Sequence, residues 1–132
     1  MASVSLEVYT DALNQPIVEG ETCCFYDKSY GMMFGVVVES RKKVKVCYTR
    51  HLVAYDAVTR QPKRTGMTRE YTTWVEGYAV VMIRESMLYE ILDGETLMAM
   101  ARMKSEMAEE IQKVLKKKER AKKNLDNLPV GQ

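Results

Sequence analysis

The sequence predicts an α+β protein in which a small antiparallel β-barrel precedes a short helix and one long, charged C-terminal helix. Five or six short runs of β-branched and aromatic residues lie close together in the first 85 residues, a spacing typical of a small barrel or a sandwich. After Ser86 apolar residues recur at helical spacing. Residues 95–124 contain no proline or glycine and are rich in Ala, Met, Glu and Lys, which favours a long helix.

Length and composition fit one globular unit. The chain has 132 residues, of which 46% are hydrophobic and 29% are charged, values near the average for soluble globular proteins. A core of ordinary size can therefore form, and global disorder is disfavoured. Within this unit we assign residues 1–85 to the β-rich barrel and residues 86–128 to a helical segment that packs partly on it.

The first half of the barrel is expected to contain four strands. The opening strand spans residues 4–9, where every second side chain is aliphatic. A second strand is expected at residues 22–26, which are mainly β-branched or aromatic. Residues 34–39 and 43–48 are two further β-prone runs, and the short polar segment 40–42 between them predicts a hairpin.

The second half is marked by a basic segment between β-prone runs. Residues 56–69 contain a proline, a glycine and several cations, and they form either an exposed loop or the tip of a long hairpin. Residues 71–75 and 78–83 are the next two β-prone runs. Glu76-Gly77 between them predicts a second hairpin.

Two helices are expected after the strands. Residues 87–92 carry apolar side chains at helical spacing, and Asp93-Gly94 ends this short helix. In the long helix over residues 95–124, apolar positions form a seam that lysines interrupt twice. Such a seam packs on its own domain more often than on a partner, but methionine-rich surfaces are adaptable. The candidate partner-binding residues of the seam are Met100, Met107, Ile111 and Val114.

Signals for export and membrane insertion are not visible in the sequence pattern. The first residues lack the basic region and apolar core of a secretory peptide. The longest apolar stretches are far shorter than the roughly 20 residues that span a bilayer. The three cysteines are odd in number and too few for a secreted disulfide scaffold. We therefore expect a cytoplasmic protein with no membrane partner.

The residues that could carry catalysis form no recognisable motif. His51 is the one histidine, so every Ser-His-Asp or Cys-His arrangement would need it, and G-x-S-x-G is absent. Cys23 and Cys24 are adjacent, so strand geometry directs their side chains to opposite faces and not to one zinc ion. The glycines form neither a dinucleotide-binding nor a phosphate-binding loop. We expect neither an enzyme nor a bound cofactor or metal.

Charge is unevenly distributed along a chain whose net charge is only +2. The count is −5 over residues 1–40, +7 over residues 41–64 and +5 over residues 113–132. Basic clusters of this kind bind phosphate backbones by releasing counterions, although charges at hairpin tips and helix ends also serve solubility and capping. The candidate nucleic-acid-binding residues are Arg41, Lys42, Lys43, Lys45, Arg60, Lys63, Arg64, Lys116, Lys117 and Arg120.

Residues 18–48 contain the turn sequence Val18-Glu19-Gly20-Glu21, then an aromatic strand, then Gly35 to Glu39 turning into Lys43 to Tyr48. This quarter of the chain resembles an SH3-like barrel of the KOW or Tudor kind. A KOW-type module implies contacts to RNA, DNA or the transcription and translation machinery through barrel loops. A Tudor-type module implies an aromatic cage for methylated side chains, with Phe25, Tyr26, Tyr30 and Tyr48 as candidates.

The sequence therefore predicts an accessory nucleic-acid-binding protein associated with transcription, translation or another nucleoprotein assembly. The basic hairpin, the segment after it and the helix tail are expected to converge on one electropositive surface for a DNA or RNA backbone. The alternative is a structural or adaptor subunit whose C-terminal helix docks on a larger protein assembly. One continuous positive face favours the first function, and scattered charges beside an apolar groove favour the second.

Overall fold

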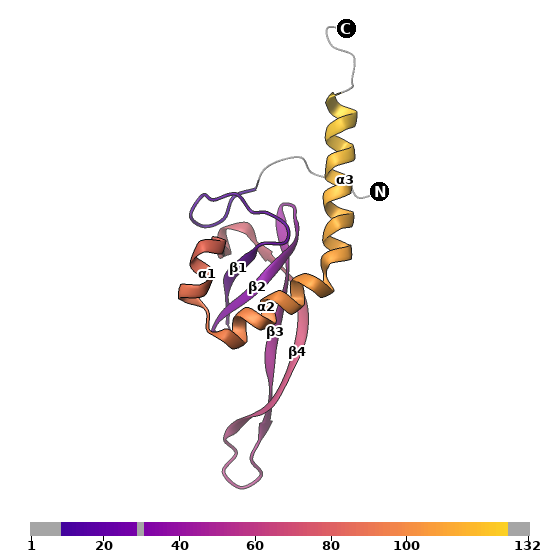
Figure 1. The fold of residues 1–132 in the computed structure, drawn as a ribbon. Coiled ribbons are helices and arrows are strands. Elements are labelled where there is room, and N and C mark those ends of the chain that lie inside the picture. Colours follow the sequence, from indigo (N-terminus) through magenta and orange to yellow (C-terminus); the bar gives the residue numbers. More distant parts are fainter. Residues whose placement is uncertain (1–8, 29–30, 127–132) are drawn as a thin grey trace.

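The computed structural model describes residues 9–28 and 31–126, apart from the side chains of residues 51–53, 64, 125 and 126. This part of the chain forms a five-stranded antiparallel sheet in the order β4-β3-β2-β1-β5, accompanied by three α-helices (Figure 1). The strands are β1 (Thr22–Asp27), β2 (Gly31–Ser40), β3 (Lys43–Tyr55), β4 (Pro62–Glu76) and β5 (Val80–Met82). The helices are α1 (Glu85–Ile91), α2 (Gly94–Glu106) and α3 (Ala108–Asp126), and a 3₁₀ turn, η1 (Gly77–Ala79), precedes β5.

The strand expected at residues 22–26 is confirmed as β1, and its side chains alternate between two cores. Cys23 and Phe25 are buried in one core, and Cys24 packs against the other. The two adjacent cysteines therefore lie on opposite faces of the sheet, as the two-residue period of a strand requires. The opening strand expected at residues 4–9 falls almost entirely outside the described residues.

The hairpin expected from residues 34–39 and 43–48 is also confirmed, as the β2–β3 pair. Its turn forms around Arg41, and the register shifts between Val37 and Glu39. Gly35 is required here by close approach, because a Cβ at this position would lie 2.5 Å from Val46 Cγ1 and 2.7 Å from the Cys47 carbonyl oxygen. The two strands can pack this closely only because residue 35 has no side chain.

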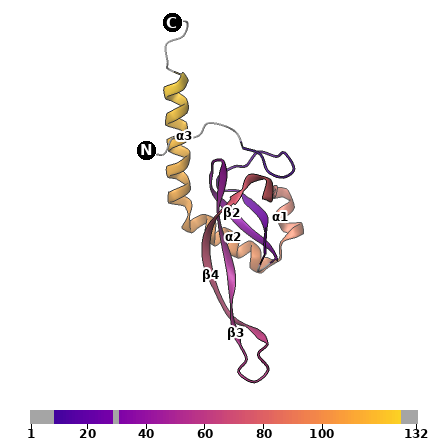
Figure 2. The ribbon, with the colours of Figure 1, turned by 180° about the vertical axis from the view of Figure 1, so that it is seen from behind.

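Of the two alternatives for residues 56–69, the structure shows the long hairpin. Strands β3 and β4 pair from Lys43↔Glu76 to Tyr55↔Pro62, and only residues 56–61 form the loop. The outer part of this hairpin extends away from the body of the molecule (Figures 1 and 2). Each described side chain from residue 54 to residue 69 is exposed.

The prediction of a second hairpin around Glu76-Gly77 is wrong. The chain leaves β4 through η1, and β5 pairs with β1 through Cys24↔Val81. Burial explains this path, because Val80 and Met82 join the core that contains Cys23 and Phe25. The β-prone run at residues 78–83 does contain a strand. Its partner, β1, lies more than 50 residues earlier in the chain, and a local sequence pattern does not predict so distant a pairing.

The other edge of β5 is occupied by the loop of residues 10–16. The Asp11 carboxylate accepts a hydrogen bond from the Met82 backbone N–H at 2.7 Å, and the Ala12 N–H donates to the Val80 carbonyl at 2.9 Å. Asp11 also accepts from the backbone N–H groups of Leu13 and Gln15. This buried carboxylate thus holds the loop against the short edge strand and satisfies its polar groups.

Two apolar cores stabilise the fold. The first lies on the face of the sheet that carries Phe25 and Tyr48, whose rings meet edge to face with centroids 5.2 Å apart. The second lies between the opposite face and the helices, where Val36 and Val38 meet Met103 and Ile111. The helices and the sheet therefore enclose the second core between them, whereas the first core lies on the other face of the sheet.

The prediction of a single long helix over residues 95–124 is wrong in one respect, because the helix is interrupted at Met107. Helix α2 ends there and α3 begins at Ala108 in a new direction (Figure 1). No glycine or proline marks the break. Met103 of α2 and Ile111 of α3 lie in the same core on either side of this break. Tertiary packing overrides helix propensity here.

The α+β class is confirmed, whereas closure of a barrel is not shown. Strands β4 and β5 are the two ends of the sheet, and no pairing joins them within the described residues. No described helix combines the length and the apolar character needed to cross a bilayer.

Candidate nucleic-acid interface

The most exposed regular feature of the molecule is the outer part of the β3–β4 hairpin, residues 50–69, here called the arm. Its two strands remain paired from Arg50↔Arg69 to Tyr55↔Pro62, with an irregularity after His51. At about 3.3 Å per residue, this paired region extends roughly 17 Å. The arm is therefore a two-stranded ribbon with solvent around it.

The tip of the arm is held in one conformation by hydrogen bonds of Asp56. Its Oδ1 accepts from the backbone N–H groups of Val58 and Thr59 at 2.8 and 3.0 Å. The Arg60 N–H donates to the Asp56 carbonyl at 2.8 Å, and Arg60 adopts a positive φ of 57°. The backbone hydrogen bonds from Thr59 and Val58 also lower the pKa of Asp56, so the capping carboxylate is ionised at neutral pH.

The charges of the arm are predominantly positive. Residues 50–69 contain five basic residues and one acidic residue, a net charge of +4. Arg60, Lys63 and Arg69 are exposed, and among the described side chains no carboxylate lies within ion-pair distance of them. The side chain of Arg64, a fourth predicted contact, lies outside the described residues.

Two arginines stack on tyrosines at the root of the arm. The Arg50 guanidinium lies 3.9 Å from the centroid of the Tyr71 ring and 5.5 Å from that of Tyr48. Arg69 lies 5.6 Å from the Tyr71 ring. Stacking fixes the planes of these groups without neutralising their charge. Neither arginine was among the predicted contacts, because their juxtaposition depends on the register of β3 and β4.

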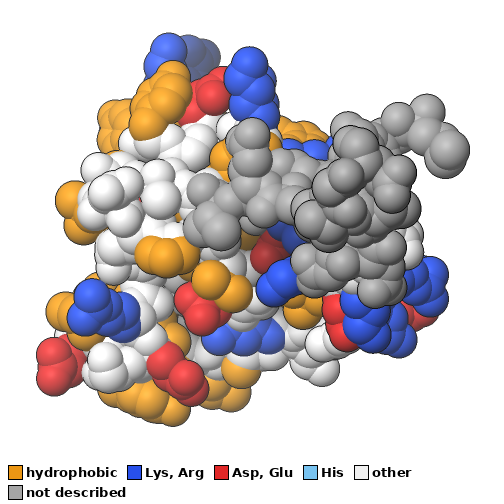
Figure 3. All heavy atoms as spheres, turned by 90° about the horizontal axis from the view of Figure 1, so that it is seen from above, with side chains coloured by type: hydrophobic (Ala, Val, Ile, Leu, Met, Phe, Trp, Pro, Cys, Tyr) orange, Lys and Arg blue, Asp and Glu red, His pale blue; other side chains and the backbone are white. Residues whose placement is uncertain are grey.

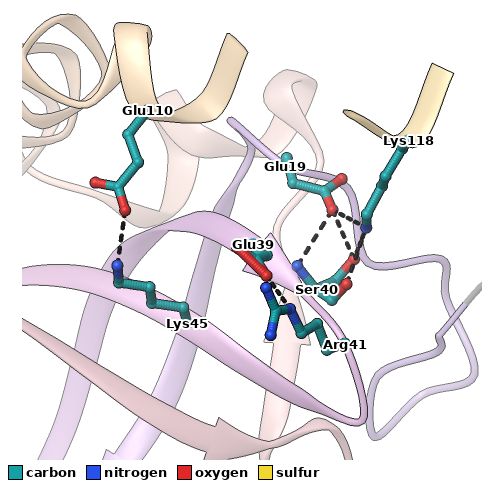
Figure 4. A network of polar contacts seen from close by, with 7 residues as sticks. All are labelled: Glu19, Glu39, Ser40, Arg41, Lys45, Glu110 and Lys118. Atoms are coloured by element: carbon teal, nitrogen blue, oxygen red, sulfur yellow. Dashed lines mark hydrogen bonds and ion pairs between the residues drawn. The ribbon is translucent and has the colours of Figure 1, made fainter. Parts of the chain in front are cut away.

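The cations of the β2–β3 hairpin have a different environment. Arg41 forms an ion pair with Glu39, and Lys45 lies 2.7 Å from Glu110 (Figure 4). Lys43 lies 3.5 Å from Glu76. Of the four predicted contacts in this hairpin, only Lys42 is exposed without a described acidic partner. The positive charge that the sequence placed here is largely compensated in the folded chain.

The third basic group lies on α3, at the other end of the molecule. Lys116, Lys117 and Arg120 are exposed, and α3 and the tip of the arm point in opposite directions (Figures 1 and 2). On the face seen from above, cationic side chains occur in separate groups among acidic and apolar ones (Figure 3). The structure therefore does not bring the hairpin, the arm and the helix tail together on one surface.

A partly buried ion pair fastens α3 to the body. Lys118 pairs with Glu19, and its Nζ donates to the Ser40 carbonyl at 2.9 Å (Figure 4). The Ser40 hydroxyl in turn donates to Glu19 at 2.8 Å. Burial alone would raise the pKa of Glu19, but the hydrogen bonds from Lys118, its own backbone and Ser40 hold it below its ordinary value. Lys118, which interrupts the apolar seam, is thus a structural residue.

The predicted partner-binding seam faces its own domain. Met100 and Ile111 are 4% and 6% exposed and belong to the helix-facing core, so they are not accessible to a partner in this fold. Met107 packs against the same core, and Val114 is half-buried. The seam therefore contributes to the core between the helices and the sheet on both sides of the break at Met107.

Cys23 and Cys47 are buried free thiols. Burial raises the pKa of Cys23 to about 12 and that of Cys47 to about 11, so both are protonated at neutral pH and poor nucleophiles. Among the described residues, no three His, Cys, Asp or Glu side chains converge as metal ligands.

One hollow of about 270 Å³ lies between β1 and the helices. It is lined by Thr22, Leu88 and Lys104 among others, and the Thr22 hydroxyl is buried without a hydrogen-bond partner. The volume is slightly below the range of roughly 300–1,000 Å³ typical of small-molecule sites.

The chain matches no known protein-family model, no curated protein and no solved structure. Its function is therefore argued from its own residues.

Proposed function

We propose that this chain is an accessory nucleic-acid-binding protein that contacts the phosphate backbone with its arm alone and not, as expected from the sequence, through one positive face shared with the β2–β3 hairpin and the helix tail. The observation that carries the proposal is a difference between the cations of the arm and those of the body in whether carboxylates pair with them. Arg60, Lys63 and Arg69 are exposed on the arm and lack acidic partners among the described residues, whereas Lys43 and Lys45 on the body are paired with carboxylates.

Counterion release supplies the driving force. A protein that neutralises Z phosphates of duplex DNA shows a slope of about −0.9Z when the logarithm of the binding constant is plotted against the logarithm of salt concentration. The three exposed cations Arg60, Lys63 and Arg69 correspond to a slope of about −3 if each meets a phosphate. The tail cations of α3 add non-specific attraction at low salt.

The test compares two variants that lose the same charge. The arm variant Arg60→Gln/Lys63→Gln/Arg69→Gln and the tail variant Lys116→Gln/Lys117→Gln/Arg120→Gln each remove three cations. Fluorescence anisotropy with labelled duplexes and single strands, over a series of salt concentrations, gives affinity and slope. We expect the arm variant to lose about three units of slope and the tail variant at most one. A flat salt response of the unmodified chain, or no binding at low salt, contradicts the proposal.

The sheet is proposed to be an incompletely closed SH3-like barrel of the KOW-type kind. Support comes from β5, which returns to pair with β1, and from the first core, in which Val80 of β5 and Tyr71 of β4 pack together with residues of the strands between them. Contact of both end strands with one core requires a strongly curled sheet. The arm then corresponds to an enlarged barrel hairpin, the kind of element through which such modules contact nucleic acid.

A second candidate function is that of an adaptor subunit in a larger assembly. The observation that favours it is the exposure of large apolar side chains on α1, where Tyr89 is 78% and Ile91 is 49% exposed. Recovery of partners from lysate before and after nuclease treatment separates the two functions. Nuclease-resistant partners that are lost with Tyr89→Ser/Ile91→Ser favour the adaptor, and partners lost on nuclease treatment favour nucleic-acid binding.

A further inference from the structure

We infer that the nucleic acid recognised by the arm is duplex DNA, entered through the major groove. This inference rests on the proposed function and makes it more specific. The observations that carry it are the two-stranded shape of the arm, the position of its cations and its preorganised tip.

The dimensions of the arm match the major groove. Paired strands lie about 4.8 Å apart, and the major groove of B-form DNA, about 12 Å wide, admits a two-stranded ribbon. No described helix packs on the outer arm, and its described side chains from residue 54 to residue 69 are exposed. The arm can therefore enter a groove without dissociating from the body.

The cations are placed for contacts with groove walls. Arg60 lies in the tip loop, Lys63 just after it, and Arg69 at the root, and all three are exposed. Basic side chains thus accompany the ribbon from one end to the other. A ribbon inside a groove lies between two phosphate backbones, so cations at its tip and its root can be neutralised together.

The tip needs no ordering on binding. The Asp56 hydrogen bonds to Val58 and Thr59 fix the loop in the free protein, which removes part of the entropic cost of association. Val58 at the apex is 91% exposed and Tyr55 is 73% exposed. Apolar groups presented in this way suit contacts with thymine methyl groups, which line the floor of the major groove.

Single strands and RNA duplexes fit the same arm less well. Proteins that bind single strands stack successive bases on aromatic side chains, but Tyr55 is the single exposed aromatic among the described side chains of the arm. In A-form RNA the major groove is deep and narrow, and protein side chains cannot read it. A single strand or an RNA duplex would therefore make fewer contacts with the arm than duplex DNA.

The test uses the full chain with duplex DNA, the corresponding RNA duplex and each DNA strand alone, at one salt concentration. We expect duplex DNA to bind at least about tenfold more tightly than either alternative, which corresponds to about 1.4 kcal/mol. Equal binding of all three nucleic acids overturns the inference and leaves the proposed function intact. No binding to any of them overturns both.

Groove choice is tested with modified duplexes. Glucosylated hydroxymethylcytosine fills the major groove, whereas an oligopyrrole ligand fills the minor groove. We expect glucosylation to weaken binding by about tenfold or more and the oligopyrrole to change it by less than about twofold. Unchanged affinity for the glucosylated duplex overturns the inference.

A shortened arm links these results to the structure. Val53 and Arg64 are opposite in register, so residues 54–63 can be replaced by an Asn-Gly turn, which suits two-residue hairpins. The removed side chains are exposed, and we expect an unchanged circular dichroism spectrum together with loss of the preference for duplex DNA. The tail variant Lys116→Gln/Lys117→Gln/Arg120→Gln is the control and should retain the preference. A shortened chain that still prefers duplex DNA contradicts the inference.

Discussion

At the scale of single residues, Gly35 shows how close packing restricts sequence. A methyl group at this position would meet Val46 Cγ1 and the backbone oxygen of Cys47 at distances below 3 Å, and the backbone oxygen cannot move without disturbing the β2–β3 pairing. We predict that Gly35→Ala lowers the free energy of unfolding by about 1–3 kcal/mol, the usual cost of overpacking a core. Urea denaturation measures it. Gly94→Ala, where a Cβ would meet no atom within 4 Å, is the control and should leave this free energy nearly unchanged.

The pair of Glu19 and Lys118 makes stability depend on pH. Because the pKa of Glu19 is below its ordinary value of 4.5 in the folded chain, folding favours the carboxylate. Its contribution is complete above the ordinary pKa and is lost as the pH falls through the lower, folded pKa. We predict that Glu19→Gln destabilises the chain at pH 7 and that the difference from the unmodified chain shrinks below pH 4.5. Urea titrations at a series of pH values measure it. A difference independent of pH would contradict this account.

At the scale of elements, local pattern predicted strands and helices well where the deciding contacts are local. Strands β1 and β2 follow from their β-branched and aromatic composition, and the first half of β3 follows from alternation, because Val44, Val46 and Tyr48 enter one core. The partner of β5 and the break at Met107 do not follow from local pattern, because both are decided by burial against residues distant in sequence. For the arm the sequence favours neither a loop nor a hairpin, since an exposed hairpin has no apolar alternation to mark its register.

The tip of the arm provides a test at this scale. We predict that Asp56→Ala increases amide hydrogen exchange at Val58 and Thr59 severalfold, because their N–H groups lose the Asp56 carboxylate. Affinity for nucleic acid should fall as the loop becomes disordered in the free state, although the substitution also removes a negative charge. Asp56→Asn retains an oxygen acceptor and removes the same charge. It is expected to preserve both the protection and the affinity. Equal exchange rates in the two variants would show that the side chain does not organise the tip.

At the scale of the whole molecule, the distribution of charge could not be predicted from its order along the chain. The run from Arg41 to Lys45 holds four cations in five residues, yet its lysines at positions 43 and 45 meet Glu76 and Glu110 from distant elements. The sequence predicts Arg60 and Lys63 as exposed cations, and both are exposed. It does not distinguish them from cations that pair with carboxylates in the folded chain. Only the folded chain shows which charges remain available.

Substitution of the paired lysines tests this difference between available cations and cations that carboxylates compensate. If the arm carries recognition, Lys43→Gln/Lys45→Gln should alter the affinity for duplex DNA by less than about twofold and the salt slope by less than about half a unit, although net charge falls from +2 to 0. The reason is that paired lysines release few counterions when DNA binds. Exposed or half-exposed pairs of this kind also contribute little to stability, about 0–1 kcal/mol each. Anisotropy titrations beside the arm variant measure the slopes. A loss of about two units would mean that DNA displaces Glu76 and Glu110 from these lysines, and the interface would then extend from the arm onto the body.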